Sequence, residues 1–303
     1  MSQDNILFDN LTNPSFGTCL QAMRLSLVEF SKIHTVDIFD NQVANAYETY
    51  LPMTLEWGDN HKISVNDLFA TDFTEFHGDF DPATNLHKPK VFVIFGAQGS
   101  GKTSLVNYLN YQWIFHEAED VLNIKDFHAA IVFEVDKVKT KEDIPNLESI
   151  LNFEYFPKGT DDQAVLNGLV SSKILWLVDG FDGATDEAKE VVKEMVLKFP
   201  LSQVLITSRW TGIEEMNEFI GDLRKSQYVR SVTMRLSPLT GLNWKLMVPK
   251  IVAANTRKSE LIEEISSQFI SKIEKSIPAS TQIFPFDLAL SIKFWLQEKY
   301  DIS

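Results

Sequence analysis

The stretch VFVIFGAQGSGKT, residues 91–103, constrains the fold more than any other part of the chain. Its first five residues are apolar, and a short continuous apolar run is typical of a strand buried on both faces. The glycines that follow allow backbone N–H groups to converge on a phosphate, and a helix beginning near Gly101 would direct its positive dipole end to the same charge. The spacing G-x-x-x-x-G-K-[ST] is that of the phosphate loop of P-loop NTPases. We therefore expect a nucleotide site between a strand and a helix.

The loop supplies most of the predicted nucleotide contacts. Lys102 would reach the β- and γ-phosphate oxygens, and the hydroxyl of Thr103 would bind Mg²⁺. The predicted nucleotide-binding residues of the loop are Gly96, Ala97, Gln98, Gly99, Ser100, Gly101, Lys102, Thr103 and Ser104.

A second motif, ILWLVDGFDG at residues 174–183, carries two aspartates. Asp179 ends an apolar run, where its carboxylate can hold the Mg²⁺ water shell opposite Thr103, which is the Walker B role. The alternative, a strand that merely ends in an aspartate turn, is less favoured beside a phosphate loop. Asp182 is a candidate to orient or deprotonate an attacking water, and its alternative role is that of a turn aspartate.

A third motif, VLITSR at residues 204–209, ends a predicted strand in polar residues. Arg209 can sense the γ-phosphate there and stabilise its charge. The alternative is a solvated surface arginine. The predicted catalytic residues are thus Lys102, Asp179, Asp182 and Arg209, and the predicted Mg²⁺ ligands are Thr103 and Asp179.

Apolar runs alternate with helical patterns through the middle of the chain, at residues 91–95, 129–135, 174–178, 203–207 and 229–236. This alternation predicts an α/β fold, the three-layer, doubly wound parallel sheet of a P-loop NTPase. The run at 129–135 suggests an extra strand between the loop strand and the Walker B strand, as in the additional-strand branch of these proteins.

Three segments are expected. Residues 1–89 form an acidic, mainly helical or irregular N-terminal region and lead-in, with an amphipathic helix around Leu20, Met23, Leu27 and Phe30. Residues 90–236 form the NTPase domain. Residues 237–303 form a small helical subdomain, in which Ser259 is a candidate N-cap and a second helix follows Pro285.

Charge and composition narrow the partner classes. The formal net charge of −14 argues against nucleic acid or an anionic membrane as the main partner. Cys19 is the only cysteine, so no internal disulfide can form, and the start of the chain does not have the pattern of a signal peptide. We expect a cytoplasmic protein.

The ordered motifs GAQGSGKT, LVDGFDG and VLITSR resemble those of the NACHT NTPases of the STAND class, over roughly residues 48–300. The resemblance implies ATP or ADP as ligand, with GTP left open, together with Mg²⁺, protein partners and nucleotide-dependent self-association in immune or defence signalling. The family's proline that contacts the nucleotide base falls, by order, on Pro285.

Two departures from the family pattern affect the expected activity. Gly183 stands where many relatives have a glutamate, so Asp182 would act alone and turnover would be slow or absent. Relatives usually continue into a winged-helix domain whose histidine touches the phosphates; here the last histidine is His128, so we expect no such contact within this chain.

Three functions are compatible with these patterns. The first is a slow NTPase that acts as a nucleotide-controlled conformational and oligomerisation switch. The alternative is a non-hydrolysing interaction module that holds nucleotide as a structural cofactor. A third, a related ATPase or small-molecule kinase, would need an acceptor pocket and an arginine-rich lid, which the sequence does not indicate.

Overall fold

The computed structural model describes residues 32–34, 43–45, 50, 53–58, 61–71, 73, 89–115, 124–135, 167–226, 229–239, 243–256, 259–278 and 281–300. The helix expected around Leu20, Met23, Leu27 and Phe30 lies outside these residues.

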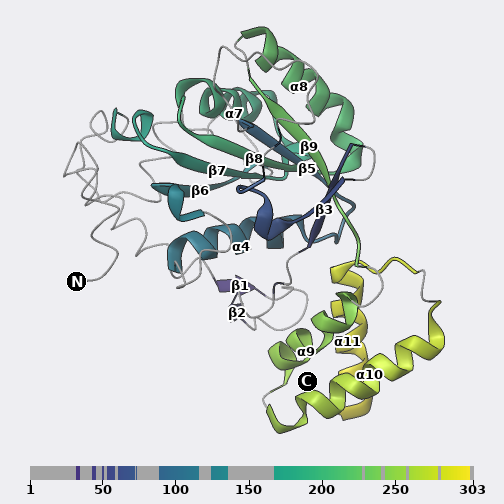
Figure 1. Cartoon of the computed structure of the whole chain (residues 1–303). Coiled ribbons are helices and arrows are strands. Elements are labelled where there is room, and N and C mark those ends of the chain that lie inside the picture. The colour runs from purple at the N-terminus through teal and green to yellow at the C-terminus, as the bar shows by residue number, and fades with distance from the viewer. Residues whose placement is uncertain are drawn as a thin grey trace, which may run out of the picture.

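A seven-stranded sheet forms the centre of the fold, in the order β4-β3-β9-β5-β8-β7-β6 (Figure 1). Its strands are β3 (Thr54–Trp57), β4 (His61–Ser64), β5 (Val91–Phe95), β6 (Ala129–Glu134), β7 (Ile174–Asp179), β8 (Gln203–Ser208) and β9 (Ser231–Leu236). The strands from β9 to β6 are all parallel, which confirms the predicted doubly wound sheet.

A hairpin from the N-terminal region extends this parallel core. Strand β3 pairs antiparallel with β9 on one side and with β4 on the other, so the complete sheet is mixed. A separate pair, β1 (Lys32–His34) and β2 (Val43–Asn45), is antiparallel. The lead-in is therefore part of the sheet rather than only helical or irregular, and this was not foreseen.

The strand that lies between the loop strand and the Walker B strand is β8. It pairs with β5 on one side and with β7 on the other. The prediction that residues 129–135 take this place is wrong, because Ala129–Glu134 form β6, which lies beyond β7 at the edge of the sheet. The carboxyl ends of β5, β8 and β7 therefore meet, and the three motifs that follow these strands become neighbours.

Helices cover both faces of the sheet. Helix α4 (Lys102–Phe115) lies on one face, and α7 (Asp186–Lys198) and α8 (Ile213–Ser226) lie on the other (Figure 1). Helix α7 buries one apolar face, and the side chain of Thr185 caps the helix by accepting a 3.3 Å hydrogen bond from the N–H of Ala188. The buried residues of this face are Ala188, Val191, Val192, Met195 and Val196. Each strand of the parallel core is largely buried, in accord with a sheet covered on both faces.

Three further helices form the helical subdomain. They are α9 (Asn243–Asn255), α10 (Ile262–Ser276) and α11 (Pro285–Tyr300). Their common core includes a T-shaped contact between Phe269 and Trp295, with ring centroids 5.3 Å apart. Helix α11 begins at Pro285 as expected, but Ser259 does not cap α10, since a 3₁₀ turn at Ser259–Leu261 precedes that helix. In the described part of the chain, no helix is long and apolar enough to cross a membrane.

Candidate functional site

Two glycines give the phosphate loop its shape. Gly99 has φ 75° and Gly101 has φ 95°, a left-handed conformation in which a side chain causes strain. A Cβ atom at Gly99 would also lie only 2.9 Å from Cβ of Phe286 at the start of α11. The main chain of the loop is thus bent at positions that require glycine, and it passes directly beside the helical subdomain.

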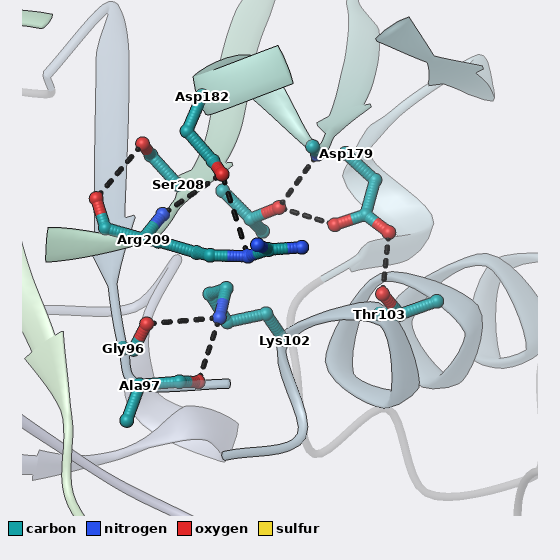
Figure 2. A network of polar contacts seen from close by, with 10 residues as sticks. Gly96, Ala97, Lys102, Thr103, Asp179, Asp182, Ser208 and Arg209 are labelled. Atoms are coloured by element: carbon teal, nitrogen blue, oxygen red, sulfur yellow. Dashed lines mark hydrogen bonds and ion pairs between the residues drawn. The ribbon is translucent and has the colours of Figure 1, made fainter. Parts of the chain in front are cut away.

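Lys102 is the first residue of α4, and its side chain extends back to the start of the loop. Its ammonium donates hydrogen bonds to the carbonyls of Gly96 and Ala97, each at 2.9 Å (Figure 2). Burial lowers the pKa of Lys102, while Asp182 and Asp179 act in the opposite direction. The cation is therefore held at the loop by neutral carbonyls, for which an anionic phosphate would be a stronger partner.

Thr103 and Asp179 bring the first two motifs together. The hydroxyl of Thr103 donates a 2.6 Å hydrogen bond to Oδ2 of Asp179. The other carboxylate oxygen, Oδ1, accepts a hydrogen bond from the buried hydroxyl of Thr207 at the end of β8. A hydroxyl and a carboxylate side by side are hard oxygen donors, the kind that Mg²⁺ prefers. The residues present therefore fit a Mg²⁺ ion bound through Thr103 and Asp179.

Asp182 and Arg209 contact each other. The main-chain N–H of Arg209 donates a 2.9 Å hydrogen bond to Oδ1 of Asp182, and Nε of the guanidinium lies 3.4 Å from Oδ2 (Figure 2). Gly212 permits this arrangement, because a Cβ atom there would lie 2.9 Å from Cβ of Asp182 and 2.8 Å from Oγ of Ser208. Both carboxylate oxygens that could have contacted a water molecule are thus engaged by Arg209.

Pro285 lies against the same loop from the helical subdomain. Its Cγ would be 3.7 Å from a Cβ atom built on Gly101. The next residue, Phe286, donates its main-chain N–H to the carbonyl of Gly99 at 3.3 Å. Of the other predicted loop residues, Gln98 is exposed and Ser100 is buried, and the N–H of Ser100 donates to the carbonyl of Ala97 at 3.2 Å.

Three residues of this site were not foreseen. Thr207 carried a signal in the polar end of VLITSR, but Gly212 and Phe286 carried none, because each matters only through a segment that is distant in sequence. Apart from Pro285, which begins α11, the predicted site residues are in the loop, in the first turn of α4, or at or just after the ends of β7 and β8.

The strand order, the glycine-shaped loop and the aspartate that faces its threonine together define a P-loop NTPase domain. The sequence model of the NACHT domain matches residues 90–239. The chain therefore carries a NACHT domain, of the STAND class of P-loop NTPases.

Among characterised proteins, the chain is similar to Protein NLRC5 of Mus musculus, with 25% identity over 160 residues. The match covers 45% of this chain and 7% of NLRC5, so the chain spans a small part of that relative.

Solved structures with similar folds come from several sources. The Walker-type ATPase PABY2304 of Pyrococcus abyssi has a TM-score of 0.40 at 10% identity, with 73% of this chain and 67% of that chain covered. PCH-2 of C. elegans has a TM-score of 0.35 at 11% identity, over 73% and 65%. Thermotoga maritima RuvB has a TM-score of 0.32 at 10% identity, over 69% and 62%.

Proposed function

We propose that this chain binds ATP or ADP together with Mg²⁺, hydrolyses ATP slowly, and uses the bound nucleotide to control how its helical subdomain packs on the NTPase domain. GTP is a second candidate ligand, because the loop reads phosphates and not the base. Lys102 and Arg209 would stabilise the charge of the phosphates, and Thr103 and Asp179 would hold the metal ion. Bound Mg²⁺ would supply charge neutralisation at the β- and γ-phosphate oxygens.

The contact between the phosphate loop and α11 carries this proposal. The carbonyl of Gly99 accepts a hydrogen bond from the N–H of Phe286, and no side chain separates the two main chains at that point. A nucleotide held by the loop would lie beside the first residues of α11, including Pro285. Binding or loss of the γ-phosphate could therefore change the position of this helix directly.

A second contact joins the subdomain, through Tyr50, to the middle of helix α4, which follows the loop. The ammonium of Lys250 in α9 donates a 2.9 Å hydrogen bond to the carbonyl of Tyr50, and burial lowers the pKa of this lysine. The ring of Tyr50 in turn stacks on Tyr108 of α4, with centroids 4.2 Å apart. With one attachment at the loop and one at α4, movement at the loop would tilt the subdomain about the second attachment.

Slow rather than fast turnover is the expected chemistry. Water must attack the γ-phosphorus in line with the bond that breaks, and it gives up a proton as it does so. Asp182 was the predicted acceptor of that proton, but its Oδ1 is already bonded to the main-chain N–H of Arg209. Gly183 provides no second carboxylate. These features favour a site that keeps its nucleotide for long periods.

The same two features favour the alternative, a non-hydrolysing interaction module that holds nucleotide as a structural cofactor. The two readings differ in what happens when nucleotide is lost. A switch should stay folded and change the packing of its subdomain, whereas a structural cofactor should leave a less stable protein behind, because bound ligand stabilises the folded state by mass action.

Protein partners and self-association belong to the proposal as well. The NACHT domain and the similarity to NLRC5 support a signalling role, in immunity or defence, in which nucleotide state sets the assembly state. The negative net charge supports protein partners over nucleic acid.

The first experiment identifies the nucleotide released when the purified protein is denatured, and then follows turnover with Mg²⁺. We expect ADP or ATP in the wild type and none in Lys102→Ala, with slow hydrolysis that the same substitution abolishes. Lys198→Ala, at an exposed lysine in the last turn of α7, is the matched control. Absence of any nucleotide, together with failure to bind added ATP or GTP, would contradict the proposal.

A second measurement separates the switch from the structural cofactor. Hydrogen exchange in α11 should differ between the ATP and ADP states of a switch, while the unfolding temperature of the nucleotide-free protein stays close to that of the bound form after correction for ligand binding. A structural cofactor predicts unchanged exchange in α11 between the two states and a large loss of stability without nucleotide.

A further inference from the structure

Asp182 holds Arg209 through two bonds of different kinds. One is the 2.9 Å hydrogen bond from the main-chain N–H to Oδ1, and the other is the ion pair between Nε and Oδ2 at 3.4 Å. The aspartate side chain is 14% exposed and the arginine side chain 55% exposed. The main-chain bond is thus the shorter contact, and the guanidinium is the solvent-accessible partner.

The contact with Asp182 places the guanidinium of Arg209 above the phosphate loop. The side chain of Arg209 runs across the space above Lys102 and toward Asp179 (Figure 2). Both side chains are cationic, and both lie at the phosphate loop (Figure 2). A γ-phosphate bound between them would be attracted to both charges.

We propose that Asp182 is a positioning residue: it holds Arg209, the arginine already predicted to sense the γ-phosphate, and so sets how strongly the site prefers a nucleoside triphosphate to a diphosphate. This inference rests on the proposed function, since it requires that the loop binds nucleotide. The main-chain bond fixes the start of the arginine side chain at the edge of the sheet. The ion pair holds the guanidinium above the loop until a stronger anion takes its place.

The two bonds respond differently to ligand. An ion pair at 3.4 Å with an exposed guanidinium is weak, and a phosphate offers that guanidinium two oxygens and more negative charge than one carboxylate oxygen. A γ-phosphate would therefore take Nε from Oδ2, while Oδ1 keeps the main-chain N–H. A diphosphate has no group at this point, so the pair between Asp182 and Arg209 remains intact.

Gly212 keeps the aspartate in position. The 3₁₀ turn that contains it, η8 (Trp210–Gly212), passes so close to Asp182 that a Cβ atom would be 2.9 Å away. Since that contact is with Cβ of Asp182, rotation of the aspartate side chain about its χ1 angle cannot relieve it. A methyl group at residue 212 would therefore displace Asp182 without changing any charge.

The test measures the dissociation constants of ADP and of a non-hydrolysable ATP analogue, both with Mg²⁺, by competition with a fluorescent nucleotide. The readout is the ratio of the two constants, which a general loss of folding does not change. Arg209→Ala should lower the preference for triphosphate by about tenfold or more, the size expected for loss of a charged hydrogen bond.

Two substitutions of Asp182 separate its roles. Both Asp182→Ala and Asp182→Asn remove the negative charge, but only asparagine keeps an oxygen that can accept the main-chain N–H of Arg209. We expect asparagine to keep the wild-type preference or to raise it by up to about fivefold, because no ion pair competes for the guanidinium. Alanine should lower the preference toward the value of Arg209→Ala. Equal ratios in the two variants would overturn the inference.

Three further variants complete the design. Asp182→Ala should have no additional effect on the ratio in the Arg209→Ala background, because the aspartate acts through the arginine. Gly212→Ala should lower the ratio as Asp182→Ala does, and it serves in place of that variant should the alanine protein fail to fold. Asp222→Asn, which removes an exposed pair with Lys225 in α8, should leave the ratio unchanged.

The outcomes distinguish this inference from the proposed function. A wild-type protein that binds neither nucleotide would contradict nucleotide binding itself. A protein that binds both, with a ratio that Arg209→Ala leaves unchanged, would overturn the inference alone.

Discussion

Thr103 and Asp179, which are 76 residues apart in sequence, share a 2.6 Å hydrogen bond at the carboxyl edge of the sheet. Each comes from a different motif, and each was predicted as a Mg²⁺ ligand. Their contact joins the helix that follows the phosphate loop to the end of β7, so that the phosphate and metal sites are built as one unit.

The first prediction concerns this pair. Thr103→Val removes the hydroxyl and keeps the shape of the side chain, so the loop should stay folded while the metal-dependent part of nucleotide binding is lost. We expect ATP to bind at least about tenfold more weakly with Mg²⁺ and about as well as wild type in the presence of a chelator, as measured by titration. Equal weakening under both conditions would mean that Thr103 contacts the nucleotide rather than the metal.

The second prediction concerns Gly99. Gly99→Ala places a side chain at φ 75° and puts Cβ 2.9 Å from Cβ of Phe286, so both strain and a clash are expected. The free energy of unfolding should fall by about 1–3 kcal/mol, as chemical denaturation would measure.

A set of matched variants isolates the clash at Gly99. Phe286→Ala keeps the Cβ atom and should not rescue Gly99→Ala, whereas Phe286→Gly should rescue it in part. Gly221→Ala is the control, because a Cβ atom there meets nothing within 4 Å in α8, and it should be neutral or slightly stabilising. Rescue by Phe286→Ala would contradict the contact described here.

The third prediction concerns the pH dependence of stability. Burial lowers the pKa of Lys90 from 10.5 to about 8. Between these values the unfolded chain binds the proton and the folded chain releases it, so this group makes the protein more stable as pH rises from about 8 to 10.5. The full shift corresponds to at most about 3 kcal/mol, and solvent screening of a partly buried group reduces it.

Lys90→Met should therefore remove part of the pH dependence of the unfolding free energy between pH 8 and 10.5. Urea unfolding of both proteins across this range measures it, and Lys272→Met, at an exposed site in α10, is the control. Parallel curves for Lys90→Met and wild type would contradict the assigned cause.

The fourth prediction concerns the attachment of the helical subdomain. Lys250→Met removes the hydrogen bond to the carbonyl of Tyr50 but keeps much of the aliphatic side chain. We expect faster hydrogen exchange in α9, corresponding to a loss of about 1–2 kcal/mol, with little change in the strands of the sheet. Uniform acceleration through the whole protein would mean that the two parts unfold together.

The sequence predicted the parallel core and the loop because each rests on a local pattern. A run such as VFVIF predicts a buried strand without reference to the rest of the chain. In the same way, the polar end of VLITSR marks the point where a strand ends. The hairpin β3–β4 was not predicted, because four-residue strands such as TLEW and HKIS give too little alternation to recognise. The order of strands in space also differs from their order in the chain, which is why residues 129–135 were assigned the wrong position.

Side-chain partnerships were the least predictable part of the site. Asp182 and Arg209 were each identified as candidates to act on nucleotide or water, yet they bind each other. Nothing in either motif indicates this contact, since it depends on how closely the turn at Gly212 approaches the turn at Asp182.

The position of β8 between β5 and β7 has a consequence for synthesis on the ribosome. Strand β5, which leads into the phosphate loop, has β8 on one side and β9 on the other. Both of these partners are synthesised after β5. The phosphate loop therefore has no paired strand beneath it until more than a hundred further residues have emerged. A nucleotide present in the cell would first find a complete site late in translation, and its binding would then favour the newly closed sheet over the open chain.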